Sequence, residues 1–243
     1  MLHPPSNWFH VYESRTSARA RLFCFAHAGG PAATYRPWRA IAPDDVEIVA
    51  IELPARRARI AEPPLLSITA IIDALAPVIE RHLDLPYTLF GHSMGAIVAF
   101  ELARRIRHRG WTAPRHLFVS GARAPQLTRA PDLHALPRDA FLAAVVALGG
   151  LPAALAAERE LMDMVMPSLR ADFTAIETWR YSAAPPFEYP ITAFGGSDDP
   201  RVDSNHLQAW SEHTTMTFRS QIFPGGHFYL EDHRAELVRS LQF

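Results

Sequence analysis

The chain has 243 residues, of which 49% are hydrophobic and 20% are charged. Its 24 basic and 25 acidic residues leave a formal net charge of −1, so no basic surplus favours a nucleic-acid partner. Cys24 is the only cysteine, which excludes an internal disulfide and fits a reducing, cytoplasmic location. Residues 1–10 contain prolines and polar residues without a long apolar run, so we expect no secretion signal.

Strand-like runs alternate with amphipathic stretches along most of the chain, which predicts parallel strands joined by helices. We expect strands at residues 21–26, 46–53, 86–90, 116–120, 191–194 and 217–223. We expect helices at 35–41, at 67–83 with Ser67 as the N-cap, at 94–109 and at 228–241. The fold class is therefore α/β, with a mostly parallel central sheet flanked by helices.

The alternation stops between residues 122 and 187, where apolar helices are predicted at 138–148, 153–167 and 168–181. Ala140 to Ala157 is uncharged over nearly the length of a membrane span, but Gly149, Gly150 and Pro152 interrupt it. We interpret this stretch as two short helices and expect no membrane partner. The resulting division is a core of residues 1–121 and 188–243 with a helical lid inserted at 122–187.

The segment Gly91-His92-Ser93-Met94-Gly95 directly follows one predicted strand and precedes a predicted helix. It fits G-x-S-x-G, the sharp turn that exposes a nucleophilic serine at the top of an α/β-hydrolase sheet. Gly91 and Gly95 allow the strand and the helix to approach closely, and the helix directs its N-terminal amides toward the serine. This context predicts that Ser93 is a nucleophile.

A serine hydroxyl needs a base within hydrogen-bond reach and a third group that orients the base. In this fold these groups follow the serine in the order Asp or Glu, then His. His227 follows a predicted strand and the Gly225-Gly226 turn, so it is the predicted base. Asp198 and Asp199 both follow the strand at 191–194; Asp199 is the predicted acid because of its Asp-Pro turn, and Asp198 is the alternative.

The oxyanion of acyl transfer needs two backbone donors. The first is predicted to be the N–H of Met94, directly after the nucleophile. The second is predicted in the loop Ala26-His27-Ala28-Gly29-Gly30, where the Ala28 N–H is preferred and His27 is the alternative. No phosphate-binding loop and no metal-ligand spacing occurs, so we expect no metal and no cofactor.

Together these residues resemble the stand-alone type II thioesterases of polyketide and nonribosomal peptide synthesis. The resemblance covers nearly the whole chain and includes stretches outside the hydrolase motifs: Glu52-Leu53-Pro54 with Arg56, Leu148-Gly149-Gly150, Glu160-Leu161, Leu169-Arg170-Ala171-Asp172-Phe173 and Gly226-His227-Phe228. It implies editing by hydrolysis of acyl groups from the phosphopantetheine arm of acyl or peptidyl carrier proteins. Ala26 departs from the family, which usually has proline there.

The predicted apolar lid offers a chamber for an acyl chain, although plain core packing explains the same pattern. The expected substrate contacts are His27, Phe141, Val145, Met166 and Phe228. Arginine clusters at 56–59 and 104–109 are either solvated surface or a docking site for an acidic carrier protein. We expect a monomer. The alternatives are an acyltransferase on the same scaffold, a non-catalytic carrier-binding accessory, and a free carboxylesterase.

Overall fold

The computed structural model describes residues 7–12, 18–127 and 132–243. The prediction about a secretion signal at residues 1–10 falls largely outside these ranges. In the described ranges one sheet has the strand order β1-β3-β2-β4-β5-β6-β7. Its strands are β1 (Phe9–Val11), β2 (Ala20–Phe25), β3 (Val46–Ile51), β4 (Tyr87–His92), β5 (Leu117–Ser120), β6 (Ile191–Gly196) and β7 (Phe218–Phe223).

All neighbouring strands run parallel except β1, which pairs with β3 in antiparallel register, Phe9 opposite Ile51. All six predicted strands are confirmed, and their ends agree with the prediction to within two residues. The strand β1 was not predicted. β1 has only three residues, too few for a periodic pattern to be recognised.

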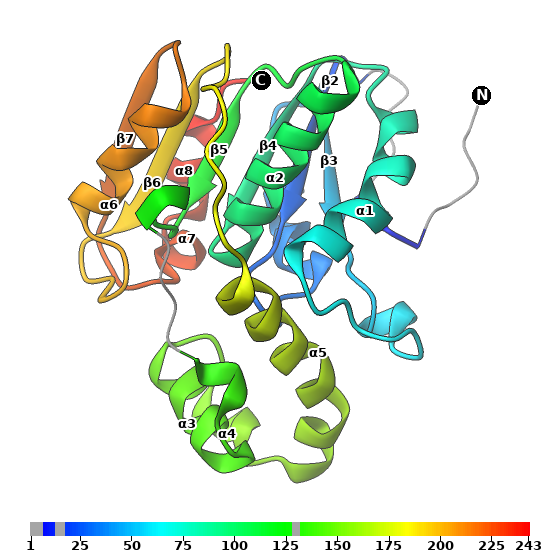
Figure 1. Cartoon of the computed structure of the whole chain (residues 1–243), viewed down its shortest axis with the longest axis vertical. Helices are drawn as coiled ribbons and strands as arrows, with labels where there is room; N and C mark the ends of the chain where they lie inside the picture. The colour runs from blue at the N-terminus through cyan, green and yellow to red at the C-terminus, as the bar shows by residue number, and fades with distance from the viewer. Residues whose placement is uncertain (1–6, 13–17, 128–131) are drawn as a thin grey trace.

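Each face of the sheet has its own hydrophobic core, because successive side chains of a strand point to opposite faces. In β2, Phe23 and Phe25 join one core with α1 (Ile68–Ile79) and α2 (Met94–Arg109). Leu22 and Cys24 join the other, with the 3₁₀ helix η1 (Ala32–Ala40) and α8 (Arg234–Ser240). Figure 1 shows α1 and α2 in front of the sheet and α8 behind it.

Helix ends follow the capping residues of the sequence. The Ser67 hydroxyl accepts a hydrogen bond from the Ala70 N–H, and a 3₁₀ turn, η3 (Glu80–His82), extends α1. α2 has the predicted bounds and ends at Gly110, which has a φ of 67°. Asp203 caps α6 (Ser204–Gln208) in a capping box with His206.

In the described part of the segment between β5 and β6, three α-helices occur: α3 (Arg138–Ala147), α4 (Ala153–Ala156) and α5 (Arg159–Thr178). The predicted boundary at Pro167 is wrong, since α5 continues through this proline and the break falls near Glu158 instead. The continuous face formed by Met166, Leu169 and Phe173 packs in a cluster of its own, and this burial outweighs the hydrogen bond that Pro167 cannot donate.

Two other predicted helices differ in detail. The segment predicted at 35–41 belongs to the 3₁₀ helix η1, which contains Pro37. The predicted helix at 228–241 is divided at His233 into α7 (Tyr229–Asp232) and α8. None of the helices in the described ranges is long and apolar enough to cross a membrane.

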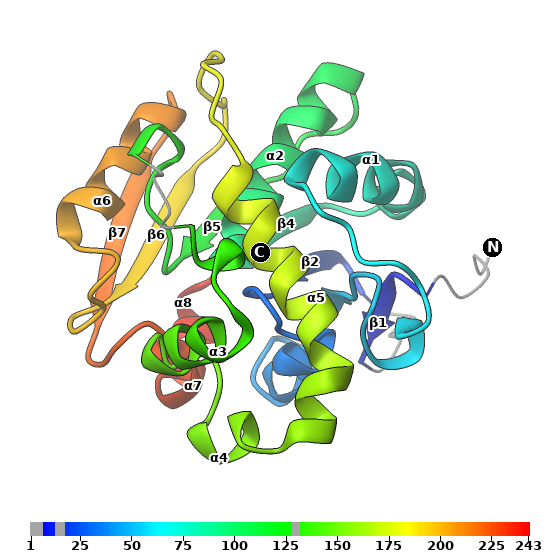
Figure 2. The same ribbon diagram turned by 60° about the horizontal axis from the view of Figure 1, so that its bottom comes forward.

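The helices α3, α4 and α5 lie across the end of the sheet where the parallel strands finish (Figures 1 and 2). From β2 the chain moves to β3 on one side, and it then returns to β4 on the other side of β2. Such a reversal leaves a crevice between the loops at the carboxyl ends of the two central strands. The loop after β2 and Ser93 after β4 both border this crevice.

Candidate active site

Ser93 lies in the tight turn between β4 and α2 and has a φ of 56°, which a non-glycine residue rarely adopts. Its N–H donates to the Ser120 carbonyl of β5 at 2.8 Å. A Cβ atom at Gly91 would lie 2.1 Å from the Gly95 carbonyl oxygen, and one at Gly95 would lie 2.1 Å from the Phe25 carbonyl oxygen. Only glycine therefore allows β2, β4 and α2 to pack at this spacing.

His227 follows β7 and reaches Ser93 across the crevice. Its Nε2 atom lies 3.0 Å from Ser93 Oγ, and its Nδ1 atom lies 2.6 Å from Asp199 Oδ2. Asp199 follows β6, and its other oxygen accepts the Arg201 N–H at 2.9 Å. With the proton on Nδ1 donated to Asp199, Nε2 is free to accept the serine proton.

The environment keeps Asp199 ionised. Burial raises the pKa of its carboxyl, but the hydrogen bond and charge of His227 outweigh this effect, and the pKa lies below its ordinary value. Asp198 takes no part in this arrangement, because its carboxylate accepts a hydrogen bond from the Ser197 hydroxyl instead. Of the two adjacent aspartates that the sequence offered, the structure brings Asp199 to His227.

The loop after β2 brings Ala28 to the same place. His27, Ala28, Ser93 and Met94 all border one cavity, and neither the Ala28 nor the Met94 N–H donates to another group of the described residues. The His27 ring packs edge-on against Phe228, with centroids 4.9 Å apart. Burial, together with the charges of His227 and Arg56, lowers the pKa of His27 to about 4, so its ring is neutral at neutral pH.

A buried polar network next to His227, formed by His92, Ser120 and Tyr229, was not predicted. His92 Nδ1 lies 2.9 Å from the Ser120 hydroxyl, which lies 2.6 Å from the Tyr229 hydroxyl. The His92 and His227 rings are 5.1 Å apart. Burial and the His227 charge hold the pKa of His92 well below its ordinary value. His92 is the variable position of the serine motif, and no sequence pattern links it to Ser120 or Tyr229.

The cavity that holds Ser93 and His227 has a volume of about 300 Å³. Three of the predicted substrate contacts line it: His27, Val145 and Phe228. Phe141 and Met166 do not, and this corrects the prediction for both. Both side chains lie in the hydrophobic cluster between α3 and α5, and Phe141 is fully buried there. An apolar helical stripe does not distinguish a residue that faces a cavity from one that faces another helix.

Several cavity residues were not predicted. The apolar ones come from α2 and the inserted helices, and they include Ile97, Phe173 and Ile176. The charged ones are Arg123, Glu177 and Arg201. The Glu177 carboxylate accepts from the Leu133 and His134 N–H groups and so holds the start of the insertion against α5. No group of three potential metal ligands occurs in the part of the chain described here.

The arginine clusters are mostly engaged in structural contacts. Arg56 and Arg59 are buried. Arg104, Arg105 and Arg107 lie toward the end of α2 that is remote from Ser93, and a helix of 16 residues is about 24 Å long. Their partners are Glu101, Asp73 and the Pro185 carbonyl. The geometry favours the interpretation of these clusters as structural or solvated surface.

The sheet, the strained serine turn and the Ser93–His227–Asp199 arrangement define the α/β-hydrolase class. The sequence matches the family model "Thioesterase domain" over residues 20–242. It is 39% identical to the gramicidin S biosynthesis protein GrsT of Aneurinibacillus migulanus, over 96% of this chain and 91% of that protein. It is 34% identical to the thioesterase PikA5 of Streptomyces venezuelae, over 96% of this chain and 84% of that protein.

Solved structures agree with these relatives. The type II thioesterase BorB from the borrelidin biosynthetic cluster has 37% identity and a TM-score of 0.89, covering 98% of this chain and 97% of that one. The type II thioesterase YbtT of the yersiniabactin pathway has 31% identity and a TM-score of 0.84, covering 96% and 95%. This chain therefore belongs to the type II thioesterases, the editing thioesterases of nonribosomal peptide and polyketide pathways.

Proposed function

We propose that this thioesterase removes acyl groups from the phosphopantetheine arm of acyl or peptidyl carrier proteins, with Ser93 as the nucleophile. The observation that carries the proposal is the continuous hydrogen-bonded line from Ser93 Oγ through His227 to Asp199, with distances of 3.0 and 2.6 Å, at the wall of a largely apolar cavity. The relatives support the choice of substrate: GrsT is named for gramicidin S biosynthesis, PikA5 is named a thioesterase, and YbtT is a type II thioesterase of a nonribosomal peptide and polyketide pathway.

The first half-reaction forms the acyl-enzyme. Ser93 Oγ attacks the thioester carbonyl while His227 Nε2 takes the serine proton, and Asp199 stabilises the resulting imidazolium. The N–H groups of Met94 and Ala28 hold the oxyanion. When the tetrahedral intermediate collapses, the C–S bond breaks and His227 protonates the departing pantetheine thiolate.

The second half-reaction uses water. His227 Nε2 takes a proton from a water molecule as its oxygen attacks the Ser93 ester, and the same two amides hold the oxyanion. Collapse returns the proton to Ser93 Oγ and releases the free acid. A solved form of the relative YbtT in which a serine is replaced by alanine supports a serine nucleophile in the family.

We further propose that residues 122–187 act as a lid over a core of residues 1–121 and 188–243. Val145 and Leu148 of the insertion line the cavity beside Phe228, so displacing α3 would open the cavity to a substrate arm. His27 and Phe228 would then contact the acyl group near the thioester, and Val145 would contact its chain.

Mass spectrometry of acyl-loaded carrier proteins tests this function. We expect the wild-type protein to convert acyl carrier to free carrier and carboxylic acid, and Ser93→Ala to leave the acyl group in place. Adding amine or alcohol acceptors separates hydrolysis from transfer, since a transferase forms its product only with an acceptor present. Full turnover by Ser93→Ala would falsify the assignment of the nucleophile.

A further inference from the structure

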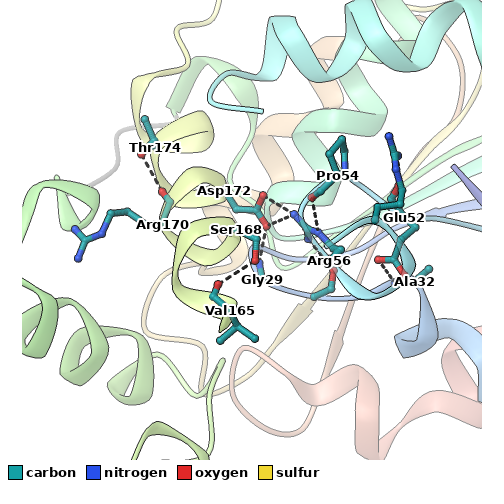
Figure 3. A network of polar contacts seen from close by, with 12 residues as sticks. Gly29, Ala32, Glu52, Pro54, Arg56, Val165, Ser168, Arg170, Asp172 and Thr174 are labelled. Atoms are coloured by element: carbon teal, nitrogen blue, oxygen red, sulfur yellow. Dashed lines mark hydrogen bonds and ion pairs between the residues drawn. The ribbon is translucent and has the colours of Figure 1, made fainter. Parts of the chain in front are cut away.

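The inserted helix α5 is tied to the loop after β2 by a buried ion pair (Figure 3). Asp172 Oδ2 accepts the Gly29 N–H at 2.7 Å. The Arg56 guanidinium donates from Nη2 to both Asp172 oxygens, at 2.8 and 3.0 Å, and from Nη1 to the Gly30 carbonyl at 3.0 Å. Asp172 is 2% exposed and Arg56 is 8% exposed, so both charges are almost fully removed from water.

We propose that Asp172 and Arg56 are positioning residues that hold the Ala28 N–H toward the reacting carbonyl. This inference rests on the proposed function, in which Ala28 supplies one of the two oxyanion donors. Neither side chain lines the cavity that holds Ser93, so they act on the reaction through the loop and not by touching the substrate.

Peptide geometry connects the ion pair to the donor. The Ala28 N–H shares one rigid plane with the His27 carbonyl. That carbonyl accepts the Gly30 N–H at 2.9 Å, so the position of Gly30 fixes the plane and the direction of the Ala28 N–H. Arg56 holds Gly30 by its carbonyl, and Asp172 holds Gly29 by its N–H. The two glycines after Ala28 are thus each anchored by one member of the pair.

The backbone of this loop needs such anchors. Gly29 has a φ of 78°, a region in which glycine is unusually free, so the residue alone does not fix the loop. Arg170, two positions before Asp172, turns to the other side of α5, where its Nη1 donates to the Leu136 carbonyl at 2.8 Å. Figure 3 shows the two side chains leaving the helix in opposite directions, so of these two polar side chains only Asp172 reaches the loop at 26–30.

The decisive test separates stability from activity with a paired substitution. Asp172→Asn and Arg56→Lys each weaken the connection and leave a buried charge less well paired, so both are expected to lower Tm as well as kcat. Replacing a whole buried ion pair by apolar residues is often neutral for stability, and the double variant Arg56→Met/Asp172→Leu is therefore expected to regain most of the wild-type Tm. We expect its kcat to stay about 10- to 100-fold below wild type, because the loop is no longer anchored.

The matched control is Glu62→Gln, in the same loop as Arg56. Glu62 pairs through both oxygens with the buried Arg59, at 2.8 and 2.6 Å, and its side chain makes no hydrogen bond to the described loop at 26–30. We expect Glu62→Gln to alter Tm while kcat stays near wild type. KM should change little in all variants, since the anchored amide acts on the oxyanion and not on the bound thioester.

A second readout reports on the oxyanion itself. Ser93 Oγ can attack the carbonyl of a trifluoromethyl ketone analogue of the substrate while His227 takes the serine proton. The adduct then carries an oxyanion at the Met94 and Ala28 amides. The inhibition constant of this analogue should rise in proportion to the loss of kcat/KM across Asp172→Asn, Arg56→Lys and the double variant.

The inference is overturned if the double variant regains wild-type kcat together with wild-type Tm, or if the inhibition constant does not change while kcat falls. If the double variant does not fold, Arg56→Lys and Asp172→Asn carry the same comparison with Glu62→Gln. Ser93→Ala is measured on the same substrates. Turnover that survives in Ser93→Ala refutes the proposed function. If Ser93→Ala is inactive but the Asp172 and Arg56 variants keep the wild-type kcat, only this inference is refuted.

Discussion

Asp199 lies 2.6 Å from His227, whereas Asp198, its neighbour in the chain, faces Ser197 and makes no contact with the imidazole. The two carboxylates therefore give a matched pair of substitutions at adjacent positions. Asp199→Asn should lower kcat on the order of 10³- to 10⁴-fold, because an amide no longer selects the tautomer with the proton on Nδ1. Asp198→Asn should leave kcat near wild type. Steady-state hydrolysis of one acyl-carrier substrate measures both, and equal losses would contradict the assignment of the acid.

At Gly95, α2 passes close to the end of β2. A Cβ atom there would lie 2.1 Å from the Phe25 carbonyl oxygen and 2.7 Å from that of Ala26. Gly95→Ala should therefore lower the free energy of unfolding by about 3 kcal/mol or more, since backbone atoms must move to admit the methyl group. Urea unfolding followed by circular dichroism measures this change.

Gly110→Ala is the control for that substitution on the same helix. Nothing lies within 4 Å of a Cβ atom at Gly110, so only its φ of 67° opposes alanine. The expected cost is about 1 kcal/mol. Similar losses for the two variants would show that the close approach of α2 to β2 is not the source of the effect.

His116 makes the stability of the protein depend on pH. Burial, with a smaller effect of the Arg219 charge, lowers the pKa of His116 to about 4, and the ring stacks on Phe118. Between about pH 6.5 and 4 the unfolded chain binds a proton at this residue that the folded protein does not bind. The stability linked to His116 is therefore fully present above about pH 6.5 and is lost as the pH falls toward 4.

His116→Gln retains a polar partner for Thr192 but does not titrate. The difference in the free energy of unfolding between about pH 7.5 and pH 5 should be smaller in this variant by about 1 kcal/mol, after allowing for partial screening of the ring by water. Urea titrations at the two pH values measure it. The absolute stability of the variant is not the readout, because the ring stacking is lost at both pH values. If this difference is the same in the variant and the wild type, His116 does not contribute to the loss of stability at low pH.

Ile176 of α5 lines the cavity, whereas Met166 on the same helix packs inside the insertion. Ile176→Phe should reduce kcat/KM for a long acyl chain relative to an acetyl group by about 10-fold, because the larger ring occupies space that the chain needs. Met166→Leu, which conserves volume, should leave the ratio unchanged. Competition between acetyl- and octanoyl-loaded carrier protein, read by mass spectrometry, gives the ratio directly. A larger change of this ratio in Met166→Leu than in Ile176→Phe would show that Met166 contacts the acyl chain.

The sequence alone determined the central sheet and the location of the site. Apolar runs predicted six of the strands, because parallel strands that are covered on both faces need apolar side chains at nearly every position. Local turn chemistry singled out Ser93 and His227. The extent of α2 was also predicted, because its start is fixed by the serine turn and its end by Gly110. These are local features, and short-range sterics and hydrogen bonding decide them.

Only the tertiary structure decided the rest. The choice between Asp198 and Asp199 depends on which carboxylate faces a histidine 28 residues away. The roles of Arg56 and Asp172, 116 positions apart, depend on how α5 crosses the end of the sheet. Phe141 and Met166 have the same apolar character as the residues that line the cavity, and only packing places them elsewhere. A side chain's burial and partners are set by contacts between distant segments, which the period of a local pattern does not specify.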